Sequence, residues 1–267
     1  MLRSMYSGIS GMKGFQQKLD VIGNNIANVN TSGFKKGRVT FQDMMSQTSA
    51  AAQGPSGGKG GSNPMQVGLG SKLGTIDTIQ TQGFQQTTDR PLDFAIEGDG
   101  MFVVNDGTTD HYTRAGIFSL DKEGYIVNPQ GYYLKGTDGE TVNDKIKIPL
   151  DAKDFSIQSN GKVTYLSADG EQHNAGVIQL AKFANPEGLE KEGNNLYRVS
   201  DNSGEPQLSD PEAGGSGKLV TGALEMSNVD LAEEFTEMIT AQRGFQANTR
   251  IITTSDEILQ ELVNLKR

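Results

Sequence analysis

Apolar residues recur every three or four positions at both ends of the chain. Over residues 2–28 this pattern predicts an amphipathic helix about 40 Å long, at ~1.5 Å per residue. Over residues 230–265 the apolar positions lie near a 3.5-residue period and predict a helix of roughly 54 Å. Asp230, with Glu233 three residues later, resembles a capping box and marks the start of the second helix.

The two predicted helices need a partner for their apolar faces. Helices that no sheet covers tend to pair with one another and with other copies of the chain, so we predict that these faces drive self-assembly. A pair of helices packed on an ordinary core is the alternative. The self-assembly residues are Leu2, Met5, Ile9, Met12, Phe15, Leu19, Ile22 and Ile26 at one end, and Leu231, Phe235, Met238, Phe245, Ile252, Leu259, Leu262 and Leu265 at the other.

The middle of the chain has short apolar runs separated by turn dipeptides such as Asn160-Gly161 and Asp169-Gly170. This pattern predicts an all-β domain over 76–228. Residues 30–75 are predicted as a connector with a Gly-rich loop, and residues 1–29 plus 229–267 as a discontinuous helical domain. The fold class is thus mainly β, with terminal helices that pair like a coiled coil. The flexible part of the connector is Gly54, Gly57, Gly58, Gly60 and Gly61.

Composition and charge exclude several kinds of site and partner. The chain has no cysteine, which excludes disulfides and thiolate metal sites, and its net charge of -9 argues against a nucleic-acid partner. Residues 1–47 carry +4, so the rest carries -13. No apolar run is long enough to span a bilayer, so no membrane insertion is expected, and the N-terminus lacks the pattern of a secretory signal.

Catalysis finds little support in the sequence. His111 and His173 are the two histidines, and no carboxylates are grouped around them in sequence. The stretch Gly54–Lys59 resembles a phosphate loop only superficially, because Gln53 and Gly60 stand where Gly and Ser or Thr are required. We therefore predict no enzyme activity, no cofactor and no metal.

Several motifs at both ends and in the middle of the chain carry a resemblance to a known family. Leu19–Asn28 (LDVIGNNIAN) and Thr31–Lys35 (TSGFK) resemble the N-terminal signature of the flagellar rod and hook proteins. Glu225–Leu231 (EMSNVDL), Met238–Asn248 (MITAQRGFQAN) and Ile252–Asp256 (ITTSD) are similar to the other end of that family. The motifs Leu92–Val104 and Tyr112–Leu120 fit its β domain, so the resemblance covers most of the chain.

The resemblance implies a tubular homopolymer in the bacterial flagellum, with the terminal helices around a channel. It also implies export through the flagellar export apparatus, and contacts with other axial proteins of the rod, hook cap and hook–filament junction. Asn24, Asn25 and Asn28 offer polar groups for a channel wall or for hydrogen bonds between helices; helix-end and turn preference is the alternative.

Hook and rod remain two interpretations. Val39–Met45 (VTFQDMM) and Leu259–Lys266 (LQELVNLK) are hook-like, whereas the modest length is rod-like. The sequence favours a hook subunit, a flexible joint for motility, with a distal rod protein of the basal body as the alternative. A secreted β-rich binding module is the alternative from another class.

Overall fold

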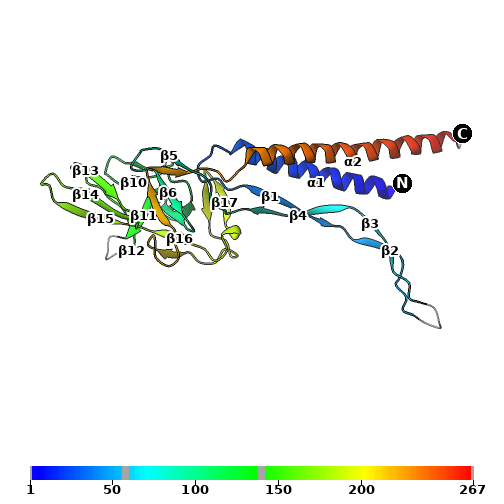
Figure 1. The fold of residues 1–267 in the computed structure, drawn as a ribbon, viewed down its shortest axis with the longest axis horizontal. Helices are drawn as coiled ribbons and strands as arrows, with labels where there is room; N and C mark the ends of the chain where they lie inside the picture. The colour runs from blue at the N-terminus through cyan, green and yellow to red at the C-terminus, as the bar shows by residue number, and fades with distance from the viewer. Residues whose placement is uncertain (1, 56–59, 138–141, 266–267) are drawn as a thin grey trace. The chain divides into compact units, whose positions relative to one another are not determined.

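The computed structural model describes residues 2–55, 60–137 and 142–265, and for Leu2 and residues 142–144 it describes the backbone alone. It divides into two compact units (Figure 1). Unit 1 comprises Met1–Ala27, Gly37–Thr78 and Asp230–Arg267, and unit 2 comprises Asn28–Lys36 and Ile79–Val229. The chain therefore passes from one unit to the other four times.

Unit 1 contains the two terminal helices, α1 (Leu2–Ala27) and α2 (Leu231–Leu265), which pack against each other in antiparallel directions. The predicted ends are thus correct to within a residue. Asp230 caps α2 as expected, because its Oδ1 accepts the backbone N–H of Ala232 at 2.8 Å. Neither helix of the described chain is long and apolar enough to cross a membrane.

Residues 37–78, most of the segment predicted as a connector, form two antiparallel strand pairs in unit 1. Strand β1 (Gly37–Asp43) pairs with β4 (Ser71–Thr78), and β2 (Ser46–Ala50) pairs with β3 (Met65–Gly68). The Gly-rich stretch follows β2 and precedes β3. Among the described residues beside it, Gln53 and Ser62 form an antiparallel bridge that continues the pairing of β2 with β3.

Unit 2 is built from antiparallel strands, which confirms the predicted all-β centre. Its largest sheet has the order β13-β14-β15-β11-β7-β8-β18-β17, and β20 pairs with β6 while β21 pairs with β5. The strands are β5 (Gln85–Thr87), β6 (Phe94–Glu97), β7 (Met101–Asn105), β8 (Asp110–Thr113), β9 (Ser119–Leu120), β10 (Ile126–Val127), β11 (Tyr133–Thr137), β12 (Val142–Lys145), β13 (Asp154–Ile157), β14 (Lys162–Leu166), β15 (Gln172–Ile178), β16 (Leu180–Lys182), β17 (Glu190–Gly193), β18 (Leu196–Arg198), β19 (Gln207–Ser209), β20 (Lys218–Thr221) and β21 (Ala223–Glu225), with a short 3₁₀ helix at Pro186–Gly188.

The core of unit 2 lies on both sides of β7. Phe102 and Val104 point into one apolar cluster, and Met101 and Val103 point into another. Because successive side chains of a strand face opposite sides, this double burial explains why the sequence of β7 is apolar throughout rather than alternating. The segment 201–218 includes β19, which pairs with β16.

Candidate assembly site

The seam between α1 and α2 in unit 1 is formed by glycines and by larger apolar side chains with heptad spacing. Met238, Phe245, Ile252 and Leu259 are half-buried on α2 and recur every seven residues. A Cβ added at Gly244 would lie 2.6 Å from the ring of Phe15. The glycine lets the two helices approach closely, which offsets its cost in helix propensity.

The same seam uses the glycines of α1. A Cβ at Gly11 would lie 2.7 Å from Nδ2 of Asn248, and one at Gly8 would lie 3.3 Å from Cγ1 of Ile252. An ion pair of 3.1 Å joins Lys18 to Glu237 near the other end. Glycine lowers the helix propensity of α1 at these positions, but in the structure the same glycines contact side chains of α2.

Asn25 ties three segments of unit 1 together. Its Oδ1 accepts the N–H of Gly37 at 2.9 Å, and its Nδ2 donates to the carbonyl of Gly37 at 2.9 Å and to Oε2 of Glu234 at 3.2 Å. The side chain is buried. Its polar groups are thus engaged inside unit 1, and of the two neighbouring candidates Asn24 is exposed and Asn28, which belongs to unit 2, is half-buried.

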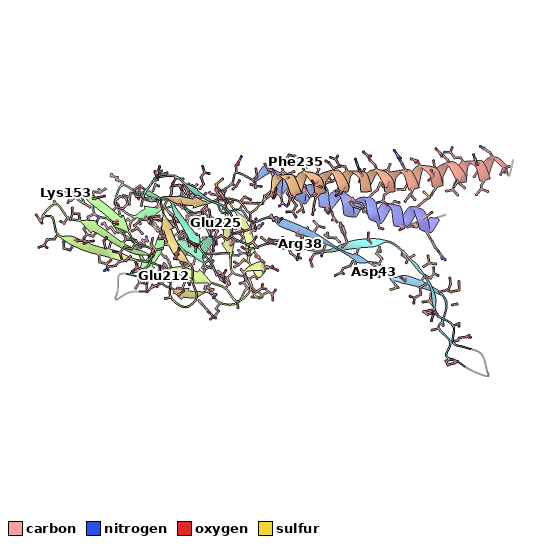
Figure 2. All side chains as sticks on the ribbon, viewed as in Figure 1. Arg38, Asp43, Lys153, Glu212, Glu225 and Phe235 are labelled. Carbon is pink, nitrogen blue, oxygen red and sulfur yellow. The ribbon has the colours of Figure 1, made fainter. Side chains whose placement is uncertain are left out.

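The predicted self-assembly residues fall into two groups. The inner group is buried or half-buried and consists of Met5, Met12, Phe15, Leu19, Ile22, Ile26, Met238, Phe245, Ile252 and Leu259. The outer group is exposed and consists of Ile9, Leu231, Phe235, Leu262 and Leu265, with Ile239, Ile251, Ile258 and Val263 beside them. Figure 2 marks Phe235 on α2. The side chain of Leu2, like Gly57 and Gly58, lies outside the described residues.

The end of α2 is free of α1. The contact of Gly8 with Ile252 sets the antiparallel register, and by that register Leu2 lies opposite residue 258. Nearly two turns of α2, from Gln260 to Leu265, therefore extend beyond the start of α1. Leu265 is 82% exposed and Val263 is 64% exposed. This end is an apolar surface without a partner among the described residues of unit 1.

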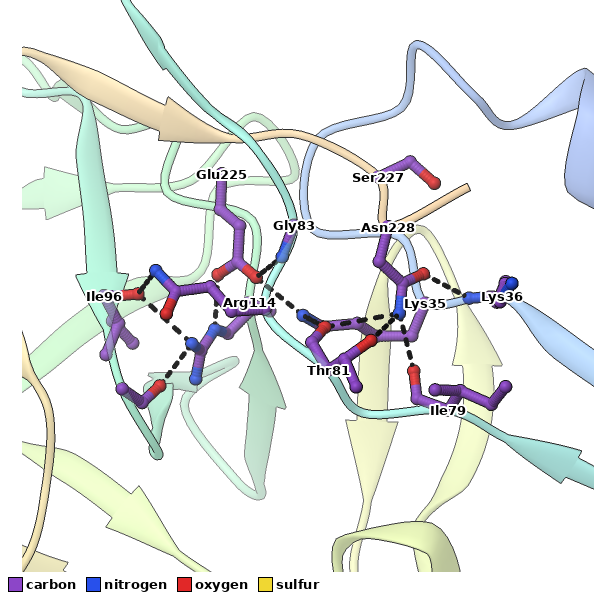
Figure 3. Close-up of polar contacts among 12 residues, drawn as sticks. Lys35, Lys36, Ile79, Thr81, Gly83, Ile96, Arg114, Glu225, Ser227 and Asn228 are labelled. Atoms are coloured by element: carbon purple, nitrogen blue, oxygen red, sulfur yellow. Dashed lines mark hydrogen bonds and ion pairs between the residues drawn. The ribbon is translucent and has the colours of Figure 1, made fainter. Parts of the chain in front are cut away.

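Unit 2 holds a buried ion cluster that joins the two terminal motifs (Figure 3). Oε1 of Glu225 accepts Nζ of Lys35 at 2.6 Å and the N–H of Gly83 at 3.0 Å, while Oε2 accepts Nε of Arg114 at 2.5 Å. The Glu225 side chain is fully buried, and that of Lys35 is 2% exposed. The motif TSGFK thus ends on a side chain that pairs with the first residue of the motif EMSNVDL.

The pKa values of Glu225 and Lys35 are both lowered, but for different physical reasons. Burial raises the pKa of Glu225, but Arg114 and then Lys35 outweigh it and hold the pKa below its ordinary value. Burial lowers the pKa of Lys35, the pair with Glu225 offsets this only in part, and repulsion by Arg114 lowers the pKa slightly further. Two cations share one carboxylate, so the carboxylate gains more from the cluster than the lysine does.

Asn228 and Arg114 complete this region. Asn228 accepts the N–H of Lys36 at 2.8 Å and donates to the carbonyls of Ile79 and Thr81 at 2.9 and 3.2 Å. Arg114 donates to the carbonyls of Ile96, Gly98 and Gly100. Sequence reasoning missed both as site residues, although each lies in a motif that carries the family resemblance.

Both histidines lie beside tyrosine rings of unit 2. His111 is buried, stacks on Tyr132 at a ring distance of 5.4 Å, and has its Nδ1 2.8 Å from Glu192. His173 is exposed beside Tyr165. Within the described ranges, no three His, Cys, Asp or Glu side chains are grouped as a metal site would require.

Comparison with known proteins decides the family. The model "Flagella basal body rod protein" matches residues 5–35, "Flagellar hook protein FlgE/F/G D1 domain" matches 95–165, and "Flagellar basal body rod FlgEFG protein C-terminal" matches 220–265. The flagellar basal-body rod protein FlgG of Bacillus subtilis is 59% identical over 268 positions, with both chains covered completely. The chain belongs to the flagellar rod and hook protein family. It is therefore a structural subunit of the flagellar axial structure.

Two further relatives separate the rod from the hook. FlgG of Caulobacter vibrioides is 39% identical over 269 positions, covering 99% of this chain and all of the relative. The flagellar hook protein FlgE of Borreliella burgdorferi is 29% identical, and its alignment extends over 441 positions with full coverage of both chains. The preference for a hook subunit drawn from the sequence is thus less well supported than the distal rod alternative.

Proposed function

We propose that the chain is a distal rod subunit of the flagellar basal body, and that it polymerises through its terminal helices. The observation that carries the proposal is the 59% identity to a basal-body rod protein of matching length. The hook protein compared above aligns over 441 positions, against 267 residues here. The hook-like segments 39–45 and 259–266 do not outweigh this difference over the whole chain.

The surfaces of unit 1 suggest how copies join. The exposed apolar residues of α2 lie away from the seam with α1, and residues 260–265 extend past the start of α1. Burying a Leu or Phe side chain that is otherwise exposed contributes about 1.5–3 kcal/mol. We therefore assign the outer group to contacts between copies and the inner group to contacts within one copy.

Strands β2 and β3 form a second exposed surface in unit 1. Met45 is 83% exposed and Met65 is 65% exposed, and every residue of both strands is exposed. A two-stranded hairpin is marginally stable alone in water, so contact with neighbouring copies is expected to order it. The partners of such a polymer would be other axial proteins at its ends and the flagellar export apparatus.

Complementation tests the proposal. Expressed in Bacillus subtilis lacking its own FlgG, the chain should restore flagellation and swimming; expressed in a strain lacking its hook protein, it should restore neither. Rescue of the hook mutant, or failure in the FlgG mutant with normal protein levels, would reject the rod assignment.

A further inference from the structure

A cavity of about 260 Å³ opens beside the buried ion cluster of unit 2. Lys35 and Arg114 line it, and their side chains are 2% and 8% exposed. Lys182 also lines the cavity, and its Nζ lies 3.3 Å from the carbonyl of Gly215 in an exposed contact. The cavity is therefore lined by two buried cations, Lys35 and Arg114, and by a third cation, Lys182, that solvent reaches.

Positively charged side chains outnumber carboxylates in and beside the cavity. Glu225 is the shared counter-ion of Lys35 and Arg114, while the exposed Asp99 is the carboxylate among the lining residues. Lys35 donates to Glu225 and to the carbonyl of Thr81, and because Lys35 and Arg114 share the single carboxylate of Glu225, the cluster keeps a net positive charge. A buried cluster with an uncompensated positive charge costs free energy, and a carboxylate is the partner that Lys and Arg both favour.

We propose that this cavity is a carboxylate-binding site, filled in the polymer by an acidic side chain of a second copy. The size suits one side chain, and Met101 and Phe183 provide an apolar wall for its methylene groups. The chain outside residues 1–47 has the required excess of acidic residues. The second copy as the source rests on the proposed function, whereas binding of a free small carboxylate has the same chemistry and does not.

The first test uses the full-length chain in dilute solution, titrated with acetate and followed by NMR of the backbone amides of Gly100, Arg114 and Lys182. Saturable shifts at these amides are expected, and Lys182→Met should weaken binding by about 1.5- to 5-fold, the usual range for an exposed ion pair. Asp99→Asn should tighten binding by a similar factor, because it removes a repelling charge. Lys153→Met, in β13–β14 surroundings away from the cavity, should change nothing.

Equal concentrations of chloride control for a general anion effect. No saturable shift with acetate, or weaker binding in Asp99→Asn, would overturn the proposal, because the second result would show that Asp99 does not repel an anion bound in the cavity. Opposite effects of Lys182→Met and Asp99→Asn support it.

The second test identifies the source of the carboxylate. If a second copy supplies it, Lys182→Met should slow polymer growth, measured by sedimentation, and 100 mM acetate should slow growth of the unaltered chain more than growth of the variant. Acetate binding with unchanged growth would assign the site to a free carboxylate and reject the second copy as its source. This outcome would leave polymerisation itself intact, so it is distinct from failure of the proposed function.

Discussion

Glu225 and Lys35 form one ion pair, yet their removal should have unequal effects. Glu225→Gln leaves Lys35 and Arg114 buried without a carboxylate, and breaking a buried pair in this way costs about 3–5 kcal/mol of unfolding free energy. Lys35→Met keeps the Glu225–Arg114 pair, which is balanced in charge. Because burial already disfavours the Lys35 ammonium, this variant should cost about 1 kcal/mol, the contribution of a typical hydrogen bond.

Urea unfolding of unit 2 in the full-length chain measures both values, with Glu97→Gln as the matched control. Glu97 pairs with Lys218 at 3.0 Å on the surface, so its loss should cost less than about 1 kcal/mol. Tyr112 and Tyr197, both buried in unit 2, report its unfolding by fluorescence. Equal losses for Glu225→Gln and Lys35→Met would refute the reasoning, because they would show that the lysine gains as much from the cluster as the carboxylate.

Four further outcomes follow from the structure. As pH falls through the lowered pKa of Glu225, the stabilising contribution of its carboxylate should be lost. The free energy of unfolding in urea should therefore fall less with decreasing pH for Glu225→Gln than for the unaltered chain. Because the folded pKa of Lys35 is lowered, the unfolded chain binds more protons at alkaline pH below 10.5, so stability should rise there, and Lys35→Met should reduce that slope. Gly244→Ala should weaken the α1–α2 seam by about 1–3 kcal/mol in thermal melts followed by circular dichroism, whereas Gly23→Ala, which meets no atom within 4 Å, should not destabilise it. Leu262→Asp should block polymerisation in sedimentation while unit 2 melts normally, and unchanged polymer yield would place Leu262 outside the contact between copies.

Long periodic patterns made much of the architecture predictable. The helices were found to within a residue because their apolar spacing continues over many turns and Asp230 supplies a start signal. Strands such as β14 were also evident, since turn dipeptides bracket them. Strands β2 and β3 were missed because Ser, Gln, Thr and Gly dominate them, and these residues resemble a loop when no core face is present.

The ion cluster could not be derived from local pattern. Lys35 and Glu225 are separated by 190 positions and meet only after unit 2 has folded. A lysine or glutamate in a polar segment is usually solvated, so sequence alone gives no reason to bury it. The inner group of helix residues could be predicted, because heptad spacing shows directly which positions share a face of a helix.

The proposed role in the distal rod has one direct test. A bacterium that carries this chain in place of its own FlgG, with a short epitope tag in the exposed turn at residues 168–170 between β14 and β15 of unit 2, would provide isolated flagella for gold labelling and electron microscopy. We predict label on the rod of the basal body and none on the hook. Label along the hook, with an unlabelled rod, would contradict the account.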